Sequence, residues 1–357
     1  MGFEENIRRV VPYVPGEQPK DKNLIKLNTN ENPYPPSPRT AEAIRQFDPG
    51  LNRLYPDPAA GKLIRAIAGR YGLEDSEVFA GVGSDDVLAM CFLTFFNGGK
   101  PVLFPDITYS FYDVWAELFR IPYEQVPLDE HFRIRPEDYD RACGGIVIAN
   151  PNAPTGELLP VEEIERIVGA HPECVVIVDE AYIDFGGESA LPLIRKYKNL
   201  IVVQTFSKSR NLAGMRIGYA MADASLIRWL NDVKYSFNSY TMSRLAIEAG
   251  AACIRDEAYF AECCRRIMET REKSADMLRA LGFRLTDSAS NFLFATHPDV
   301  QAKDIFDYLR GRGIYVRWWD KPRIRNYLRI TVGTDREMEV LGEALAEFLR
   351  RIATALR

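Results

Sequence analysis

Short apolar runs alternate with helical patterns from Val78 to about residue 221, and this alternation constrains the fold more than any other feature of the chain. The runs are rich in β-branched residues, which is typical of buried strands. Helical patterns fill most gaps, for example at residues 85–96, 110–119 and 161–169. Strands that alternate with helices predict an α/β fold with a mainly parallel sheet covered by helices. The expected strands are residues 78–81, 101–105, 121–127, 145–149, 174–178, 200–204 and 216–221.

The chain has 357 residues, more than one hydrophobic core usually supports, so we expect more than one domain. Residues 1–36 are rich in proline and asparagine and predict an extended N-terminal arm. Residues 37–255 are interpreted as a large domain, and a long helix at about 256–281 opens a smaller α/β C-terminal domain, residues 256–357. The expected elements of this domain are strands at 291–296, 314–317 and 327–331 and helices at 301–311 and 335–356.

The charge balance and the apolar pattern exclude several classes of protein. A formal net charge of -5 without a polybasic run argues against nucleic-acid and membrane-surface partners. No apolar run approaches the length of a transmembrane helix, and the acidic, polar N-terminus is unlike a secretory signal. The six cysteines and three histidines lack metal-ligand spacing, so we expect no metal site. These observations predict a cytoplasmic protein.

A single lysine, Lys208, follows the expected strand 200–204 and is surrounded by hydroxyl side chains. Thr205 and Ser207 precede it, and Arg216 lies eight residues beyond. A buried position and a nearby cation both favour the neutral, nucleophilic form of an amine, which can form a Schiff base beside a bound phosphate. A solvated loop lysine is the alternative interpretation of Lys208 taken alone.

Two further segments follow expected strands at the sheet edge where α/β proteins bind ligands. Gly-Val-Gly-Ser-Asp follows strand 78–81 and opens a helix, whose N-terminal N–H groups at Ser84 and Asp85 are suited to an anion. The third glycine of a dinucleotide motif is missing, which argues against a nicotinamide site. Tyr109 follows strand 101–105 and either stacks on a planar ring or belongs to the core.

An asparagine and an acid follow the next two strands. Asn152 lies in the loop Asn-Pro-Asn-Ala-Pro-Thr-Gly, where it either donates to a ring oxygen or belongs to a rigid turn. Asp179 follows a run of apolar residues, and a carboxylate there can keep a pyridinium nitrogen protonated. Magnesium binding is the alternative for Asp179, but no phosphate-binding Gly-x-x-x-x-Gly-Lys-Ser/Thr loop accompanies it.

The ordered motifs of this chain resemble those of fold-type I pyridoxal-phosphate aminotransferases. The motifs are Gly-x-Gly-Ser-Asp, Tyr109, Asn-Pro-Asn-x-Pro-Thr-Gly, Asp-Glu-Ala-Tyr and Ser-Lys-x₇-Arg-x-Gly. The segments Leu-Asn-Thr-Asn-Glu-Asn-Pro, Leu-Tyr-Pro-Asp and Tyr-Leu-Arg-Ile-Thr-Val-Gly narrow the resemblance to the histidinol-phosphate aminotransferase family. The resemblance covers nearly the whole chain and implies a fold-type I fold in which residues 37–255 bind the cofactor.

The resemblance implies a pyridoxal 5'-phosphate cofactor attached to Lys208, which would also carry the proton between substrate and cofactor. Asp179 would pair with the pyridine nitrogen, and Tyr182 would contact the ring oxygen. Tyr109 would stack on the ring. The implied phosphate ligands are Ser84, Asp85, Thr205, Ser207 and Arg216.

The resemblance also implies substrate and subunit contacts. Arg329 would bind a substrate carboxylate bidentately. Arg317 and Tyr13 match positions that help to hold the phosphate of histidinol phosphate. Tyr55 would reach the cofactor phosphate of a neighbouring subunit, so a homodimer is implied. The family usually has asparagine directly before Pro-Thr-Gly, whereas this chain has Ala153, and Asn152 is expected to take over the ring-oxygen contact.

The function that we predict is amino-group transfer between L-histidinol phosphate and 2-oxoglutarate, with glutamate as the second product, in histidine biosynthesis. An aromatic amino acid aminotransferase is one alternative, since the same arginines would serve either donor. A pyridoxal-phosphate decarboxylase of a phosphorylated amino acid is another. A non-catalytic binding or regulatory protein with this fold is disfavoured because Lys208 and Asp179 are both present.

Overall fold

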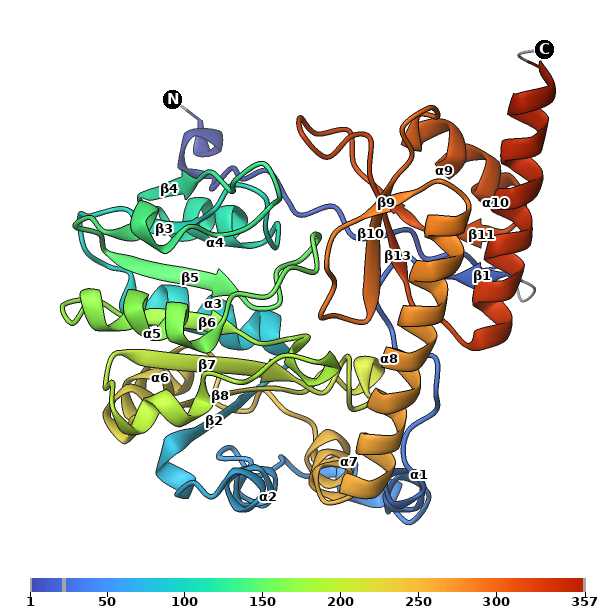
Figure 1. Cartoon of the computed structure of the whole chain (residues 1–357). Helices are drawn as coiled ribbons and strands as arrows, with labels where there is room; N and C mark the ends of the chain where they lie inside the picture. The colour runs from blue at the N-terminus through green and yellow to red at the C-terminus, as the bar shows by residue number, and fades with distance from the viewer. Residues whose placement is uncertain (1, 21–23, 356–357) are drawn as a thin grey trace.

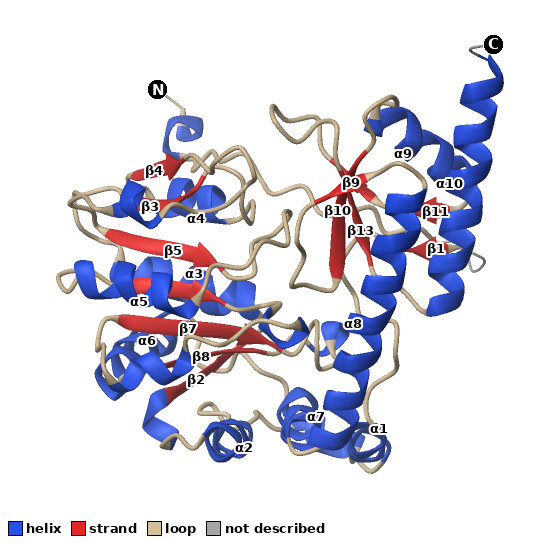
Figure 2. Ribbon diagram, in the orientation of Figure 1, coloured by secondary structure: helices blue, strands red, loops and turns tan. Residues whose placement is uncertain are grey.

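A mainly parallel sheet forms the centre of the large domain in the computed structural model, which describes residues 2–20 and 24–355 (Figures 1 and 2). The order of its strands is β2-β8-β7-β6-β5-β3-β4. Neighbours from β7 to β4 are parallel, whereas β8 is antiparallel to both β2 and β7. The strands are β2 (Val78–Gly81), β3 (Val102–Pro105), β4 (Tyr123–Val126), β5 (Gly145–Ala149), β6 (Val176–Asp179), β7 (Leu200–Thr205) and β8 (Gly218–Ala222).

Both faces of this sheet are covered because successive side chains of a buried strand point to opposite faces. Val176 and Val178 of β6 pack into one hydrophobic cluster, and Ile177 packs into the other. The first cluster includes residues of α2 (Gly61–Tyr71), α5 (Val161–Ala170) and α7 (Arg244–Ile254). The second includes residues of α3 (Ser84–Phe95), α4 (Tyr112–Phe119) and α6 (Ala224–Phe237). The predicted α/β fold class, a mainly parallel sheet covered by helices, is therefore confirmed.

The C-terminal part of the chain forms a second, antiparallel sheet with the strand order β12-β13-β10-β9. Helices α9 (Ala302–Gly311) and α10 (Asp335–Ala355) lie beside it on the right of Figure 1. The short strand β9 was not expected from the sequence. The strands of this sheet are β9 (Arg284–Leu285), β10 (Phe292–Thr296), β12 (Arg317–Trp318) and β13 (Leu328–Thr331).

The strand expected at residues 314–317 is two strands in two different sheets. β11 (Ile314–Tyr315) pairs in parallel with β1 (Ile25–Lys26), which belongs to the N-terminal segment. β12 pairs with β13 instead. The expectation of one strand was wrong because the partner of β11 comes from the other end of the chain, which a local pattern does not reveal.

The N-terminal segment crosses from the large domain to the small one before it reaches α1 (Pro38–Arg45), as the blue trace in Figure 1 shows. Leu27 of this segment is buried in the hydrophobic cluster of the small domain. Ile25 and Leu27 of this segment thus belong to the hydrophobic cluster of the C-terminal part of the chain. The boundaries 1–36, 37–255 and 256–357 remain a prediction.

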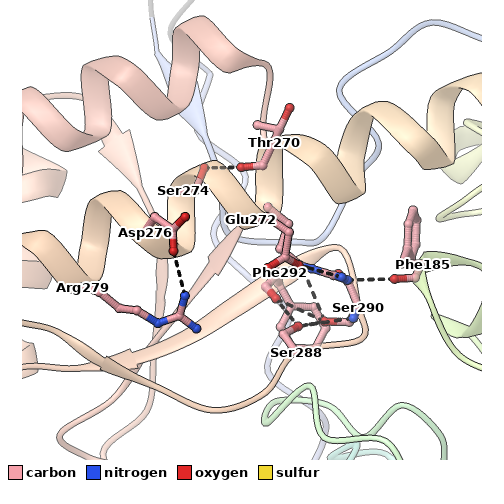
Figure 3. A network of polar contacts seen from close by, with 10 residues as sticks. Phe185, Thr270, Glu272, Ser274, Asp276, Arg279, Ser288, Ser290 and Phe292 are labelled. Atoms are coloured by element: carbon pink, nitrogen blue, oxygen red, sulfur yellow. Dashed lines mark hydrogen bonds and ion pairs between the residues drawn. The ribbon is translucent and has the colours of Figure 1, made fainter.

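The long helix α8 (Glu257–Ala280) links the two domains, and its buried Arg271 ties them together. Arg271 Nη1 donates to the carbonyl of Phe185 at 2.8 Å and to that of Ser290 at 2.9 Å. Figure 3 shows Phe185 and Ser290 near the same part of α8, with Ser288 and Phe292 beside Ser290. The buried guanidinium shared by these two carbonyls holds the backbone of Ser290 close to that of Phe185. None of the described helices is long and apolar enough to cross a bilayer.

Candidate active site

Two adjoining cavities lie where the carboxyl ends of the central strands meet the N-terminal segment and the small domain. The inner cavity has a volume of about 110 Å³ and the outer one about 590 Å³. Ligands bind at this edge in α/β sheets. The side chains that line both cavities are Asp85, Tyr109, Ala153, Tyr182 and Lys208.

Lys208 lies just beyond the end of β7 and reaches the wall between the cavities. Its Nζ donates to the carbonyl oxygen of Thr29 at 3.0 Å and lies 5.7 Å from the centre of the Tyr182 ring. The amide of Asn32 donates to the backbone carbonyl of Lys208 at 3.0 Å. The amine is therefore held by the N-terminal segment on one side and faces open cavity on the other.

Asp179 ends β6 at the base of the inner cavity. Its carboxylate accepts from the hydroxyl of Tyr112 at 2.8 Å and from the backbone N–H of Ala181 at 3.2 Å. Burial raises the pKa of Asp179 to about 6, although both hydrogen bonds oppose that rise. Burial and the Asp179 carboxylate raise the pKa of Tyr112 well above its usual 10, so Tyr112 remains a donor. The carboxylate is suited to a cationic partner within the cavity.

The N-terminus of α3 opens onto the inner cavity at Ser84, and no side chain caps it. The first N–H groups of a helix have no intrahelical partner and attract anions. Gly83 adopts φ +88°, and a Cβ at this position would lie 2.5 Å from Nη2 of Arg216. A Cβ at Gly218 would lie 2.2 Å from the backbone nitrogen of Ser84. Only glycine permits this close approach of a cation and a strand to the helix N-terminus.

Hydroxyl groups and Arg216 surround the same helix end. Thr205 donates to Ser207 Oγ at 3.0 Å, and Arg216 Nη1 lies 3.4 Å from that oxygen. Arg216 also pairs with the Asp85 carboxylate at 3.2 Å, and the Tyr109 hydroxyl donates to that carboxylate at 2.7 Å. A helix N-terminus, a guanidinium and two hydroxyls are donors of the kind that bind phosphate.

Arg329 and Arg317 line the outer cavity and lie against the same ring. Each guanidinium carbon is 5.2 Å from the centre of the Trp319 ring. Arg329 Nη2 donates to the carbonyl of Asn28 at 3.0 Å, and Arg317 donates to the carbonyls of Val14 and Pro15. Across residues 2–20 and 24–355, neither arginine has a carboxylate partner. The Nε of Arg329 has no hydrogen-bond acceptor, and burial lowers the pKa of Arg329 below its usual 12.5. No carboxylate of the described residues therefore neutralises either guanidinium.

Tyr13 lines the outer cavity. Its ring stacks on Phe111 with 4.2 Å between the centroids. Burial raises the pKa of Tyr13, while Arg317 and Arg329 lower it. The structure thus brings Tyr13 from the N-terminal segment to the same cavity as the two arginines.

Asn152 is a predicted ligand that lines neither the inner nor the outer cavity. Its Oδ1 accepts from Thr108, and its amide donates to the carbonyl of Ile107 at 2.9 Å and to Thr155 Oγ1 at 3.0 Å. The amide hydrogens hold two loops together in this structure, and the ring-oxygen contact of Asn152 stays a prediction. Ala153 lines the cavities instead.

Tyr55 is also remote from both cavities of its own chain. Its side chain is 77% exposed and lies against Tyr240, with 4.6 Å between the ring centroids. Arg244 donates to the backbone carbonyl of Tyr55 at 2.8 Å. The segment is therefore fixed in place while the ring faces outward.

The family model for aminotransferase class I and II matches residues 22–345. A histidinol-phosphate aminotransferase from Aromatoleum aromaticum is 53% identical over 348 residues, covering 96% of this chain and 98% of the relative. One from Clostridium beijerinckii is 50% identical and covers 96% of both chains. The chain belongs to the histidinol-phosphate aminotransferase family.

A solved relative supports the assignment to the histidinol-phosphate aminotransferase family at the level of structure. The enzyme from Sinorhizobium meliloti, in complex with pyridoxal-5'-phosphate, superimposes with a TM-score of 0.85 at 26% identity. The match covers 92% of this chain and 91% of the solved one.

The motif analysis missed several residues that complete the site in this member of the histidinol-phosphate aminotransferase family. Tyr112 holds Asp179, and Trp319 lies against both arginines. Thr29 and Asn30 contact Lys208 and Tyr182. Tyr112 lies three residues after Tyr109, on the first turn of α4. This short separation is a local signal that Tyr112 belongs to the same site as Tyr109. The contacts of Thr29 and Asn30 have no local signal because their partners lie more than 150 positions away.

Proposed function

We propose that this chain is a pyridoxal-phosphate-dependent aminotransferase that exchanges an amino group between L-histidinol phosphate and 2-oxoglutarate in histidine biosynthesis. One observation carries the proposal. The amine of Lys208 shares a cavity with two arginines, Arg317 and Arg329, that have no carboxylate partner among the described residues. A nucleophilic amine beside two unneutralised guanidiniums is suited to a substrate that carries an amine or oxo group and an anion.

The inner cavity supports pyridoxal 5'-phosphate as the cofactor. The uncapped N-terminus of α3, Arg216 and the hydroxyls of Thr205 and Ser207 would hold its phosphate, together with the backbone N–H groups of Ser84 and Asp85. The absence of a side chain at Gly83 lets the Arg216 guanidinium lie beside the N-terminus of α3. The cofactor, when bound, supplies an electron sink for the bond to be broken.

The other side chains of the inner cavity would orient the cofactor and move a proton. Asp179, ionised and held by Tyr112, would pair with the pyridine nitrogen. Tyr109 would stack on the ring, and the Tyr182 hydroxyl would donate to the ring oxygen. Lys208 would bind the cofactor covalently and, once displaced by substrate, carry a proton at Nζ to and from the substrate carbon.

The outer cavity would bind the rest of the substrate. Arg329, with its free Nε, would bind the carboxylate of 2-oxoglutarate or glutamate. Arg317 and Tyr13 would bind the phosphate of histidinol phosphate. Both arginines lie against Trp319 and so belong to one site. This site would accept either anion, because a guanidinium binds carboxylate and phosphate with the same paired geometry.

A homodimer with shared sites also belongs to this proposal. Tyr55 is exposed and lies against Tyr240, which is also exposed, and contiguous exposed apolar side chains mark an interface. In this proposal Tyr55 leaves its own chain and contacts the cofactor phosphate of the partner subunit. A role in histidine biosynthesis favours a cytoplasmic location. The exposed set is Leu51, Leu54, Tyr55, Trp229, Tyr235, Phe237 and Tyr240.

The visible absorption spectrum of the purified protein tests the proposal. Addition of L-histidinol phosphate without an oxo acid should replace the band of bound pyridoxal phosphate with that of the pyridoxamine form. Later addition of 2-oxoglutarate should restore the first band and release glutamate in equal amount. A spectrum that responds to phenylalanine and not to histidinol phosphate would instead assign the donor to the aromatic amino acids, which Trp319, Tyr13 and Phe111 could contact.

A further inference from the structure

Three consecutive residues of the N-terminal segment each bind one functional side chain of the site. The Asn28 carbonyl accepts from Arg329 at 3.0 Å, and the Thr29 carbonyl accepts from Lys208 at 3.0 Å. The amide of Asn30 donates to the hydroxyl of Tyr182 at 2.9 Å. The first two contacts use the backbone, which every residue type supplies. The third depends on the side chain of Asn30 itself.

The orientation of the Asn30 amide is fixed by Thr331 of β13. Thr331 Oγ1 accepts from the backbone N–H of Asn30 at 3.0 Å and donates to Asn30 Oδ1 at 3.0 Å. Because Oδ1 is the acceptor for Thr331, Nδ2 must be the atom that faces Tyr182. The amide of Asn291 donates to the Asn30 carbonyl at 3.0 Å. Asn30 is 1% exposed and adopts φ +57°, a conformation that asparagine tolerates better than most residues.

This arrangement sets the direction of the Tyr182 proton. A phenol hydroxyl has one proton to donate, and the bond from Asn30 occupies an acceptor position on the oxygen. The proton is then available to an acceptor in the cavities, both of which Tyr182 lines. A partner that accepted from Tyr182 would instead have turned this proton away from the cavity.

Thr331 also connects the Asn30–Tyr182 contact to β13, the strand that carries Arg329. Thr331 and Arg329 lie two positions apart on β13, so both point to the same face of the strand. The Phe292 ring lies 5.1 Å from the Tyr182 ring and 5.3 Å from the Arg329 guanidinium, measured to ring centres. Asn30 therefore joins β13, which carries Arg329, to Tyr182 of the large domain.

We propose that Asn30 is a positioning residue that holds the Tyr182 hydroxyl as a donor to the ring oxygen of the cofactor. Through Thr331, Asn30 also fixes the position of this hydroxyl relative to β13. The inference rests on the proposed function, because it assigns the Tyr182 proton to a bound pyridoxal phosphate. It concerns a residue that acts through Tyr182 and does not line the inner cavity.

Asn30→Asp is the sharpest test because it keeps the shape and the acceptor for Thr331 but replaces the donor to Tyr182 with an acceptor. The Tyr182 proton should then turn toward residue 30. A donor on the ring oxygen stabilises its negative charge, so loss of that donor should raise the pH midpoint at which the absorption band of the bound cofactor shifts. We expect a rise of about one pH unit in Asn30→Asp and in Tyr182→Phe. The double variant should show no further rise.

Further variants separate positioning from folding. Asn30→Gly removes the amide yet tolerates the positive φ, and Thr331→Val frees the amide without touching a cavity. Both should raise the pH midpoint in the same direction, by less than Asn30→Asp. Asn199→Asp changes a half-buried asparagine that donates to the carbonyls of Val168, His171 and Cys174, far from the cavities. It should lower the thermal midpoint but leave the pH midpoint unchanged.

The outcomes distinguish this inference from the proposed function. A wild-type protein that shows no band of bound cofactor would overturn both. A wild-type protein that transaminates, with a pH midpoint that shifts in Tyr182→Phe and not in Asn30→Asp, Asn30→Gly or Thr331→Val, would overturn the role of Asn30 alone. Additive shifts in the double variant would also overturn it, because two residues acting through one hydroxyl cannot add.

Discussion

The amine of Lys208 lies 3.0 Å from the carbonyl oxygen of Thr29, a residue 179 positions earlier in the chain. The N-terminal segment therefore supplies part of the cavity wall and holds the amine of Lys208. The same segment contributes Tyr13 to the lining of the outer cavity. Ordering of residues 24–32 against the small domain is thus a condition for a complete site.

Lys208→Arg should abolish covalent retention of the cofactor, because a guanidinium is not a nucleophile at neutral pH. We expect the turnover number to fall by at least about 100-fold, the scale of a lost proton carrier. Gel filtration followed by an absorption spectrum measures retention, and glutamate release measures turnover. Lys196 is an exposed lysine, so Lys196→Arg is the matched control and should behave as the wild type. Retention of the cofactor band by Lys208→Arg would contradict the assignment.

Asp179→Asn should stabilise the cofactor-free protein at pH 8 while it weakens cofactor binding. The pKa of Asp179 is raised from 3.8 to about 6 by burial, so ionisation of this carboxyl costs the folded state stability as the pH rises from about 4 to above 6. The wild-type penalty at pH 8 is at most about 3 kcal/mol. At pH 4 the carboxyl is already protonated in the folded protein, so the stabilising effect of the variant should nearly vanish.

Urea unfolding of both cofactor-free proteins at pH 4 and pH 8 checks this difference. Glu180, whose pKa burial raises to about 7, titrates in both proteins and cancels in the comparison. An equal stability difference at the two pH values would show that burial does not govern the Asp179 carboxyl.

Arg329→Gln should reduce kcat/KM for 2-oxoglutarate by about 100-fold, because it removes a charge-assisted contact with the carboxylate. Arg317→Gln should reduce kcat/KM for histidinol phosphate more than for 2-oxoglutarate. Arg329 has a free Nε and lies deeper, whereas Arg317 is bonded to the N-terminal segment near Tyr13. Steady-state rates with each substrate varied in turn measure both effects. Equal losses for both substrates in both variants would mean that the two arginines are not specialised.

Gly83→Ala should weaken cofactor binding by at least about 10-fold and destabilise the fold by about 1–3 kcal/mol. Its Cβ would lie 2.5 Å from Nη2 of Arg216, and the residue has φ +88°. Gly69→Ala is the control, because no atom lies within 4 Å of the Cβ and the position is helical. Equilibrium dialysis of pyridoxal phosphate and thermal unfolding report the two quantities. Unchanged affinity for pyridoxal phosphate in Gly83→Ala would show that the N-terminus of α3 is not part of the phosphate site.

Tyr55→Ala should lower the affinity for cofactor in a homodimer although Tyr55 lines neither cavity of its own chain. Mixed dimers of Tyr55→Ala and Lys208→Ala chains should recover one native site, since each chain supplies what the other lacks. Absorption titration of the mixture, compared with each variant alone, measures the recovery. A monomeric protein in sedimentation, or no recovery on mixing, would contradict the shared site.

Local patterns predicted much of the large domain. The β-branched runs that end at Asp179 and Thr205 form β6 and β7, because a strand buried on both faces needs an uninterrupted apolar run. Parallel strands bring their carboxyl ends to one edge, so the polar residues that follow them, Asp179 and Lys208 among them, meet in one cavity. The sequence order alone therefore indicated most of the residues around Lys208.

Contacts between distant segments were decided by the tertiary structure. The pairing of β1 with β11 split an expected strand, and the amide of Asn152 donates to Ile107 of a neighbouring loop and to Thr155 of its own loop. Neither outcome has a local signal, since both depend on which partner competes for a backbone or an amide donor.

The sequence by itself predicted the fold class and the positions of Lys208 and Asp179 after buried strands, because apolar periodicity and residue type are local properties. The roles of Arg329 and Arg317 were implied by the family resemblance. Only the tertiary structure decided how these groups are held. Thr29 and Asn30 reach Lys208 and Tyr182 across 179 and 152 positions. Hydrogen bonds of this kind require atoms to meet within about 3 Å, and that proximity is set by the packing of whole domains.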